Sequence, residues 1–425
     1  MVSLKNGILK VEYENSERAK RFFDICFVLN IVTIFALYAV KLVATVTGIM
    51  TLVAAVFIWV DRREKKVVIP YNSVWYLIFT LYCGLTSFWS EYVPTSNIIM
   101  VGKMVVIIAM ITAIAIYVDT PEDLERLMSL FIFSVVIIIL LELTSRPLTG
   151  IFDGGFGSGF SYFNSNEIAF WIMCAEMMAF YKAYIKNKKA CYILVVFFVI
   201  FVIATSSRKA TVSAVVSPLI MVLMTTRKKY KFLQVIGLII AIGAVAYLIM
   251  TNDQLYNAVG RRFNSMMNYY SDDTVKTDSS IAMRNYYIEI AKELFGESPL
   301  FGKGMANFIR IIGDAYNVKG AYCHNNYWQV LSELGITGFV LYYSFYFFII
   351  VKLAKDIIKN KSRIAIIFLA FMIVEMILEW GIVSFNTKTS QIVVALAYTA
   401  TYVGESDGRK YRYIKNNINK LEEEI

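Results

Sequence analysis

One histidine stands where an imidazole could take part in chemistry. His324, the only histidine in the chain, lies where a long polar stretch meets a hydrophobic run. With an ordinary pKa of ~6.5, its imidazole is largely neutral at pH 7, which is the form that a general base needs. Nearby arginines would lower this pKa further. A single histidine without a cysteine or aspartate cluster beside it argues against a metal site.

Two neighbouring cations occupy an unusual place. Arg208 and Lys209, in "SSRKA", join two apolar runs on the side that we assign to the exterior, where short loops normally carry few cations. The planar fork of arginine suits phosphate because it donates two parallel hydrogen bonds. We therefore interpret the pair as an anion site, rather than as side chains that snorkel to lipid phosphates. Arg284, in a long loop, would alone be an ordinary solvated arginine.

Two glycine pairs flank the histidine in sequence. Gly302 and Gly304 lie in "GKGMAN", which lacks the strand and βαβ unit of a dinucleotide site. They favour a tight turn that returns the loop to the membrane. Gly335 and Gly338 form "GITG" near the start of an apolar run, where small residues permit close helix packing.

The composition defines the elements that must position these residues. Hydrophobic residues make up 58% of the chain and charged residues 17%, against about 25% charged in a typical soluble protein. Apolar runs of bilayer length recur along the sequence. The sequence therefore predicts an all-α polytopic membrane protein with about twelve transmembrane helices, over 22–40, 42–60, 73–90, 97–118, 124–144, 165–185, 190–205, 211–226, 232–251, 326–351, 364–384 and 389–403.

The charge distribution sets the orientation. Most of the 42 Lys and Arg residues fall in segments on one side of these runs, so the positive-inside rule places both termini in the cytoplasm. The net charge of +10 is then a topology signal and does not indicate nucleic-acid binding. We predict a cytoplasmic N-terminus (1–21), nine helices (22–251), an extracytoplasmic loop (252–325), three helices (326–403) and a basic tail (404–425).

The long loop is predicted to contain a helix, and several acidic residues near the spans are candidates for a function. A helix is predicted from about Ser280 to Phe295, capped by Ser279 or Ser280 and ended by Gly296 and Pro299. Acidic residues in or near the spans fit either a proton relay in a transporter or sugar binding in an aqueous cavity, and the sequence alone leaves both open. These residues, with one lysine, are Glu142, Glu167, Glu176, Glu375, Glu379 and Lys103.

Together these pieces resemble the integral-membrane O-antigen polymerases and ligases. That family carries a histidine, a small amide or hydroxyl residue, nine further residues and a G-x-x-G, which His324, Asn325 and Gly335-Ile-Thr-Gly338 reproduce. Arg284 followed by "PLFGKGMANF" and Ser207-Arg208 also match. Asn166, in "YFNSNE", matches an "F-x-N-x-N" element. Lys209 departs from the usual small residue, and Tyr162 from the usual phenylalanine.

The resemblance implies a membrane glycosyltransferase of GT-C-like architecture in the cell membrane, with its active site on the extracytoplasmic face. The donor would be a glycan on undecaprenyl diphosphate. His324 would be the base, and Arg208, Arg284 and Lys209 would hold the diphosphate. Supporting roles would fall to Asn325, Gly335, Gly338, Gly302, Gly304 and Asn166. The resemblance implies inverting transfer without metal or cofactor, with membrane lipids, a chain-length regulator and a flippase as partners.

Several functions are consistent with this pattern of residues. Polymerases and ligases share the motif. We favour a polymerase because the chain is rich in Lys, Asn and Ile, typical of an AT-rich genome and of a Gram-positive cell that has no lipid core to ligate. A lipid-oligosaccharide flippase would need neither the long loop nor the histidine spacing, and no internal repeat is visible. An assembly scaffold would tolerate replacement of Arg208, Arg284 and His324.

Overall fold

The computed structural model describes residues 2–36, 41–61, 70–92, 95–144, 165–225, 230–271, 279–316 and 321–403. Within these ranges the chain is helical and contains no strand, which agrees with the predicted all-α class. The glycine-rich loop 145–164 and the basic tail lie outside the described residues. The helices of the bundle are α1 (Val2–Ala36), α2 (Lys41–Asp61), α3 (Tyr71–Leu85), α4 (Thr95–Tyr117), α5 (Pro121–Thr144), α6 (Ser165–Phe180), α7 (Cys191–Ala204), α8 (Arg208–Met224), α9 (Lys231–Thr251), α14 (Asn326–Asn360), α15 (Arg363–Leu378) and a final helix over 388–403.

The bundle is organised around α6. Every residue of α6 from Ile168 to Phe180 is buried, as expected for a helix that is apolar all round and surrounded by others. It packs against α5, α7 and α8, and α8 in turn packs against α15. At the periphery, only 6% of the apolar stretch of α9 is buried inside the protein. Its exposed apolar side chains therefore require a nonpolar surrounding such as lipid.

Six of the described helices are long and apolar enough to cross a membrane, which supports a multi-pass membrane protein. Each predicted span coincides with a helix over most of its length, but several of these helices are short. For example, α7 has 14 residues. The predicted count of about twelve spanning helices is therefore not confirmed.

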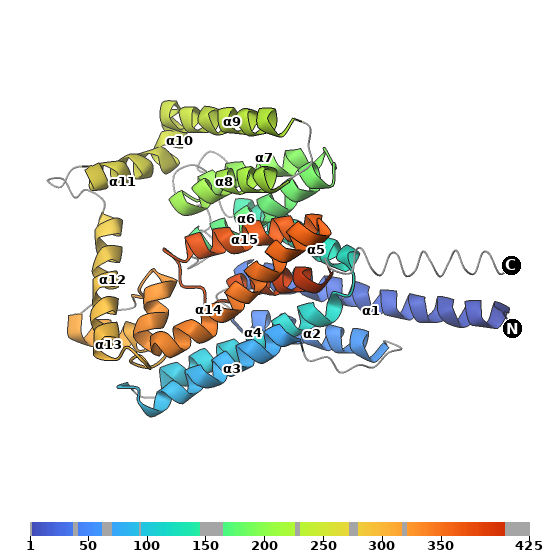
Figure 1. The fold of residues 1–425 in the computed structure, drawn as a ribbon, viewed down its shortest axis with the longest axis horizontal. Helices are drawn as coiled ribbons and strands as arrows, with labels where there is room; N and C mark the ends of the chain where they lie inside the picture. Colours follow the sequence, from blue (N-terminus) through green and yellow to red (C-terminus); the bar gives the residue numbers. More distant parts are fainter. Residues whose placement is uncertain are drawn as a thin grey trace.

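A small helical layer lies across one end of the bundle. It contains α12 (Ser279–Glu297) and α13 (Phe308–Tyr316), and α12 runs across the direction of the bundle helices (Figure 1). The long loop thus forms the helix predicted from about Ser280 to Phe295. Tyr287, Leu294 and Ile312 join Cys323 in a separate hydrophobic cluster that ties α12, α13 and the start of α14 together.

The glycine pairs join this layer to α14. Gly335 has φ 66 and ψ −171, which breaks the helix after Leu334. In a regular helix the N–H groups of Ile336 and Thr337 would bond to the carbonyls of Ser332 and Glu333. Here Ile336 donates instead to Pro299 O at 2.8 Å, and Thr337 to Leu300 O at 3.2 Å.

The loop completes this exchange from its own side. The carbonyls of Ser332 and Glu333 accept hydrogen bonds from the N–H groups of Lys303, at 2.9 Å, and Gly304, at 2.8 Å. The backbone of 299–304 is therefore inserted into the hydrogen-bond ladder of α14, and all the freed backbone groups named here are satisfied. We call this insertion of 299–304 into α14 the joint. Because 299–304 directly follows α12, the joint fixes α12 relative to α14.

Close approach explains why the joint needs glycine. A Cβ at Gly302 (φ +71) would lie 2.3 Å from the carbonyl carbon of Glu333, and one at Gly335 would lie 2.4 Å from Leu300 O. The packing predicted for "GITG" occurs at Gly338, where a Cβ would lie 3.0 Å from a ring carbon of Tyr82 on α3. At Gly335 the close partner is a loop backbone rather than a helix, so that part of the prediction was wrong.

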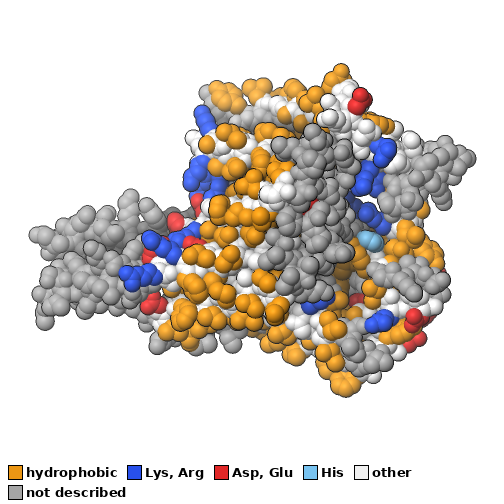
Figure 2. All heavy atoms as spheres, turned by 180° about the vertical axis from the view of Figure 1, so that it is seen from behind, with side chains coloured by type: hydrophobic (Ala, Val, Ile, Leu, Met, Phe, Trp, Pro, Cys, Tyr) orange, Lys and Arg blue, Asp and Glu red, His pale blue; other side chains and the backbone are white. Residues whose placement is uncertain are grey.

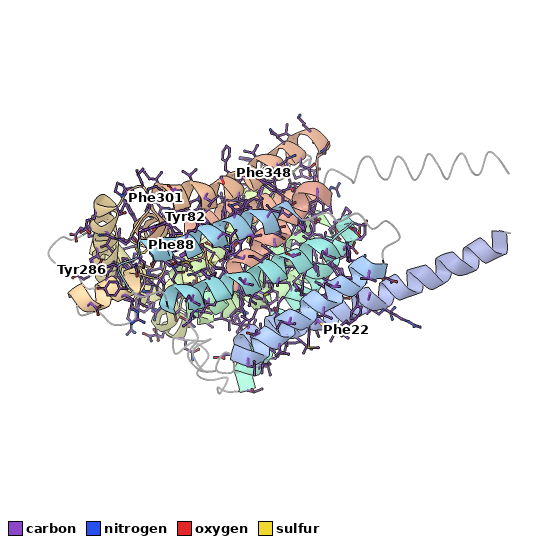
Figure 3. The ribbon with its side chains drawn as sticks, turned by 90° about the horizontal axis from the view of Figure 1, so that it is seen from below. Phe22, Tyr82, Phe88, Tyr286, Phe301 and Phe348 are labelled. Atoms are coloured by element: carbon purple, nitrogen blue, oxygen red, sulfur yellow. The ribbon has the colours of Figure 1, made fainter. Side chains whose placement is uncertain are left out.

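Aromatic side chains surround the joint. Tyr82 donates to Leu334 O at 2.7 Å, and the ring of Trp89 lies between those of Tyr82 and Phe301 at centroid distances of 6.4 and 5.8 Å. Tyr82, Phe88 and Phe301 lie close to the end of the bundle that carries Tyr286, whereas Phe348 and Phe22 lie farther along it (Figure 3). Because Trp and Tyr favour the membrane–water interface, we expect this group to mark the interface level.

Candidate active site

Four cationic side chains line a cavity of about 440 Å³ between α8, α11 (Arg261–Ser271), α12 and the segment that follows α15. They are Arg208, Lys209, Arg262 and Arg284, and the described lining contains no Asp or Glu. Figure 2 shows Lys and Arg side chains gathered beside the single pale blue histidine. Such a concentration of positive charge provides a binding site for an anion with several charges.

The turn before α8 positions Arg208. Ser206 adopts a left-handed conformation (φ 59), and the hydroxyl of Ser207 donates to Asn166 Oδ1 at 2.8 Å. Arg208 Nη1 then donates to the carbonyl of Arg262 at 2.7 Å, while Arg262 Nη1 donates to the carbonyl of Ser206 at 3.1 Å. This reciprocal pair of bonds holds two like charges close together, although they repel each other.

Lys209 extends toward Gly381, in the segment after α15. A Cβ added to Gly381 would lie 1.5 Å from Lys209 Nζ, so a side chain at this position would displace the ammonium from its present place. Burial, and then the charges of Arg284 and Arg208, lower the pKa of Lys209 to about 8. The described residues provide no carboxylate near it that would reverse this shift, so a bound anion would stabilise the charged form.

His324 lies on the turn between α13 and α14. Its backbone is left-handed (φ 55), a conformation that costs a non-glycine residue energy and is often found at functional sites. Its ring contacts that of Tyr322, with centroids 3.9 Å apart, and lies 6.1 Å from the ring of Tyr287. Burial, and then the charges of Arg284 and Lys209, lower the pKa of His324 to about 4. The imidazole is therefore neutral at pH 7.

Asparagines hold the histidine turn in place. Asn325 caps α14, since its Oδ1 accepts from the N–H of Trp328 at 3.2 Å, and its buried Nδ2 has no partner among the described residues. Asn326 donates its N–H to Glu379 O at 2.8 Å, and its Oδ1 accepts from the N–H groups of Ser384 and Phe385. These bonds tie the segment that ends α15 to the start of α14.

The predicted site residues fall into two groups. Arg208, Lys209, Arg284 and Asn166 line the cationic cavity, and His324 lies within the electric field of two of them. The others do not line it: Asn325 caps α14 through its side chain, Gly302, Gly304 and Gly335 belong to the joint, and Gly338 packs against Tyr82. Arg262 was missed, because in sequence it is one of many loop cations.

The fold and this cavity define a class of protein. An all-helical membrane protein with a polycationic cavity and a neutral imidazole at one end of its bundle is suited to act on an anionic substrate held in the membrane. The comparison with known families refines this class. Residues 193–343 match the model of the O-antigen ligase family, and the match includes all the candidate residues named above except Asn166. It supports a glycan-processing enzyme of the ligase and polymerase superfamily. No curated protein matches the chain.

The cationic cavity predicts a difference between two adjacent arginines. Arg262 lines the cavity and donates to Ser206 O, whereas its neighbour Arg261, which is equally exposed, does not line it. We expect Arg262→Gln to weaken binding of a diphosphate anion by roughly 10- to 100-fold, because charge-assisted hydrogen bonds contribute about 1.5–3 kcal/mol. The matched control Arg261→Gln should bind as the wild type does. Isothermal titration in nanodiscs measures both, and equal losses would show that only net charge matters.

The single histidine makes its titration directly measurable. In protein labelled at histidine and prepared without a histidine tag, NMR should report one imidazole with a pKa near 4. Because this value lies below the ordinary 6.5, stability present at neutral pH should be lost as the pH falls from about 6.5 toward 4. Adding a diphosphate anion, or replacing Arg284 by glutamine, should raise the pKa of His324. A value that does not change would contradict the electrostatic arrangement.

Proposed function

We propose that the protein is a polysaccharide polymerase of GT-C-like architecture. It would transfer the growing glycan of a capsule, O-antigen or exopolysaccharide from undecaprenyl diphosphate to a hydroxyl of the next lipid-linked repeat unit, on the extracytoplasmic face of the cell membrane. The observation that carries the proposal is the group of four cations beside a neutral imidazole. A diphosphate carries the complementary charge, and a hydroxyl nucleophile requires a base.

The proposed reaction is a single displacement. His324 accepts the proton of the attacking hydroxyl while the oxygen of that hydroxyl forms a bond to the anomeric carbon of the donor glycan. The bond from that carbon to the diphosphate oxygen breaks, and its electron pair leaves with undecaprenyl diphosphate. Arg208, Arg262 and Arg284 stabilise the charge that develops on the leaving group. Attack from the face opposite the leaving group inverts the anomeric configuration.

No step of this proposal uses a metal ion. Four cationic side chains offset the charge of the diphosphate, which is the task that Mg²⁺ performs in many phosphate-binding enzymes. Chain growth by the purified protein should therefore continue in EDTA at the rate measured with added Mg²⁺. Loss of activity that Mg²⁺ restores would contradict this part of the proposal.

A ligase is the second candidate, because the matching family model is described as O-antigen ligase. The chemistry is shared, and only the acceptor differs. A size ladder of lipid-linked and surface glycan, from cells with and without the gene, separates a polymerase from a ligase, and the side of the membrane on which repeat units remain separates both from a flippase. A polymerase predicts single repeat units in the null strain. Long chains that remain on the carrier would indicate a ligase, and repeat units that stay on the cytoplasmic side would indicate a flippase.

A further inference from the structure

A second cavity, of about 370 Å³, adjoins the cationic one. Asn166, Phe170 and Ile382 line both cavities, so the two share a wall. The rest of the second lining includes amides and hydroxyls from three parts of the chain, namely Tyr322, Gln329, Asn386, Thr387, Thr389 and Ser390. Groups of this kind can exchange several hydrogen bonds with the hydroxyls of a sugar.

His324 lines neither cavity, but it interacts with residues of both. On one side, the charges of Arg284 and Lys209, which line the cationic cavity, act on its imidazole. On the other side, its ring contacts Tyr322, which lines the second cavity. The preceding residue is anchored to the same wall, because the N–H of Cys323 donates to Gln329 Oε1 at 2.8 Å. A general base takes the proton of the acceptor hydroxyl while that hydroxyl attacks the donor. It must therefore be close to the places where both substrates bind.

The two cavities differ in the ionisable side chains that line them. The described lining of the second contains two carboxyl side chains, Glu167 and Glu333, and no Lys or Arg. Lys388, between two lining residues in sequence, is not part of that lining. Glu333 also fixes the wall, since its Oε1 accepts from Gln329 Nε2 at 2.8 Å and from the N–H of Phe308 at 3.2 Å. Carboxylates accept bonds from hydroxyls and pair with ammonium groups, but repel another carboxylate.

We propose that this second cavity binds the acceptor sugar, and that it selects a neutral or amino sugar over an acidic one. This inference rests on the proposed function, since it says where the sugar that carries the nucleophile of that reaction binds. The acceptor hydroxyl reaches His324 from the Tyr322 side, and the donor diphosphate stays among the arginines on the other. A uronic acid at the attacking position would meet two carboxyl side chains, Glu167 and Glu333, and no Lys or Arg of the described lining, so its carboxylate would be buried there without a cationic partner.

Asn386 provides a clean test of the acceptor site. Its amide lines the second cavity and makes no hydrogen bond with the described residues, so Asn386→Leu should not disturb the fold. We expect this variant to bind undecaprenyl diphosphate within about twofold of the wild type and to lose about tenfold in chain growth. Asn257→Leu, at an exposed position that lines neither cavity, is the matched control and should behave as the wild type does.

Each outcome has a distinct meaning. If Asn386→Leu loses undecaprenyl diphosphate binding as Arg284→Gln does, the second cavity belongs to the donor and the inference is wrong. Unchanged chain growth in Asn386→Leu would also overturn it. If the wild type binds no undecaprenyl diphosphate and the null strain still makes long chains, the proposed function itself fails.

The sugar selectivity has its own measurement. Methylation analysis of the polymer identifies the sugar whose hydroxyl forms the bond between repeat units. We expect a neutral or amino sugar there, and a uronic acid at that position would overturn the selectivity. Comparison with the null strain, which should lack this linkage while keeping all those within the repeat unit, ties the result to this protein.

Discussion

Replacing His324 by alanine should reduce the rate of chain growth by roughly 10²- to 10⁴-fold, the usual contribution of a general base. Binding of undecaprenyl diphosphate should survive, because the side chains that line the cationic cavity are unchanged. The loss should therefore appear in kcat, measured as lipid-linked polymer formed per unit time by purified protein in nanodiscs. Chain growth near the wild-type rate would remove His324 from the mechanism.

A second variant separates chemistry from folding. His324 has a left-handed backbone, which asparagine tolerates better than most residues do. We expect His324→Asn to keep or slightly raise the melting temperature, because the strain at this turn is relieved. It should nevertheless lose as much activity as His324→Ala, since an amide does not accept a proton at neutral pH. Activity in the asparagine variant would mean that the side chain has only a structural role.

Replacing Gly335 by alanine should destabilise the protein by roughly 3–5 kcal/mol, the upper end of single-substitution effects. The added Cβ would lie 2.4 Å from Leu300 O, on a backbone with φ 66 that favours glycine. The loop 299–304 would have to leave the ladder of α14, and the N–H of Ile336 and the carbonyl of Ser332 would lose their partners. Thermal unfolding in nanodiscs should show the lower melting temperature.

The same variant should also lose activity, because the joint connects the helix that carries Arg284 to the helix that begins beside His324. Gly237 and Gly243 are the controls. Both are helical residues of α9, and a Cβ at either meets nothing within 4 Å. Alanine there should be neutral or stabilising by up to about 1 kcal/mol, the ordinary helix preference over glycine. If Gly335→Ala behaves like these controls, the joint does not constrain the site.

The sequence by itself determined the class of protein and most of its helices. Hydrophobic runs such as 97–118 and 124–144 require burial or lipid whatever their neighbours are, so helices formed where apolar periodicity and length placed them. The cap and stop residues around α12 predicted its bounds to within a few residues for the same local reason. Arg208, Lys209 and His324 were singled out because ionisable side chains beside apolar runs are costly to place without a function.

The tertiary structure alone decided which of these residues meet. Arg208 and Arg284 are far apart in sequence, and the cavity between them depends on how α8, α11 and α12 pack. Arg262 gave no signal in the sequence, because a cation in a long loop is ordinary until another element faces it. Gly302 and Gly335 belong to motifs whose spacing was visible, but their shared role depends on a backbone exchange between segments more than thirty residues apart. Local composition governs burial and helix formation, whereas contacts between distant segments arise only when the chain packs.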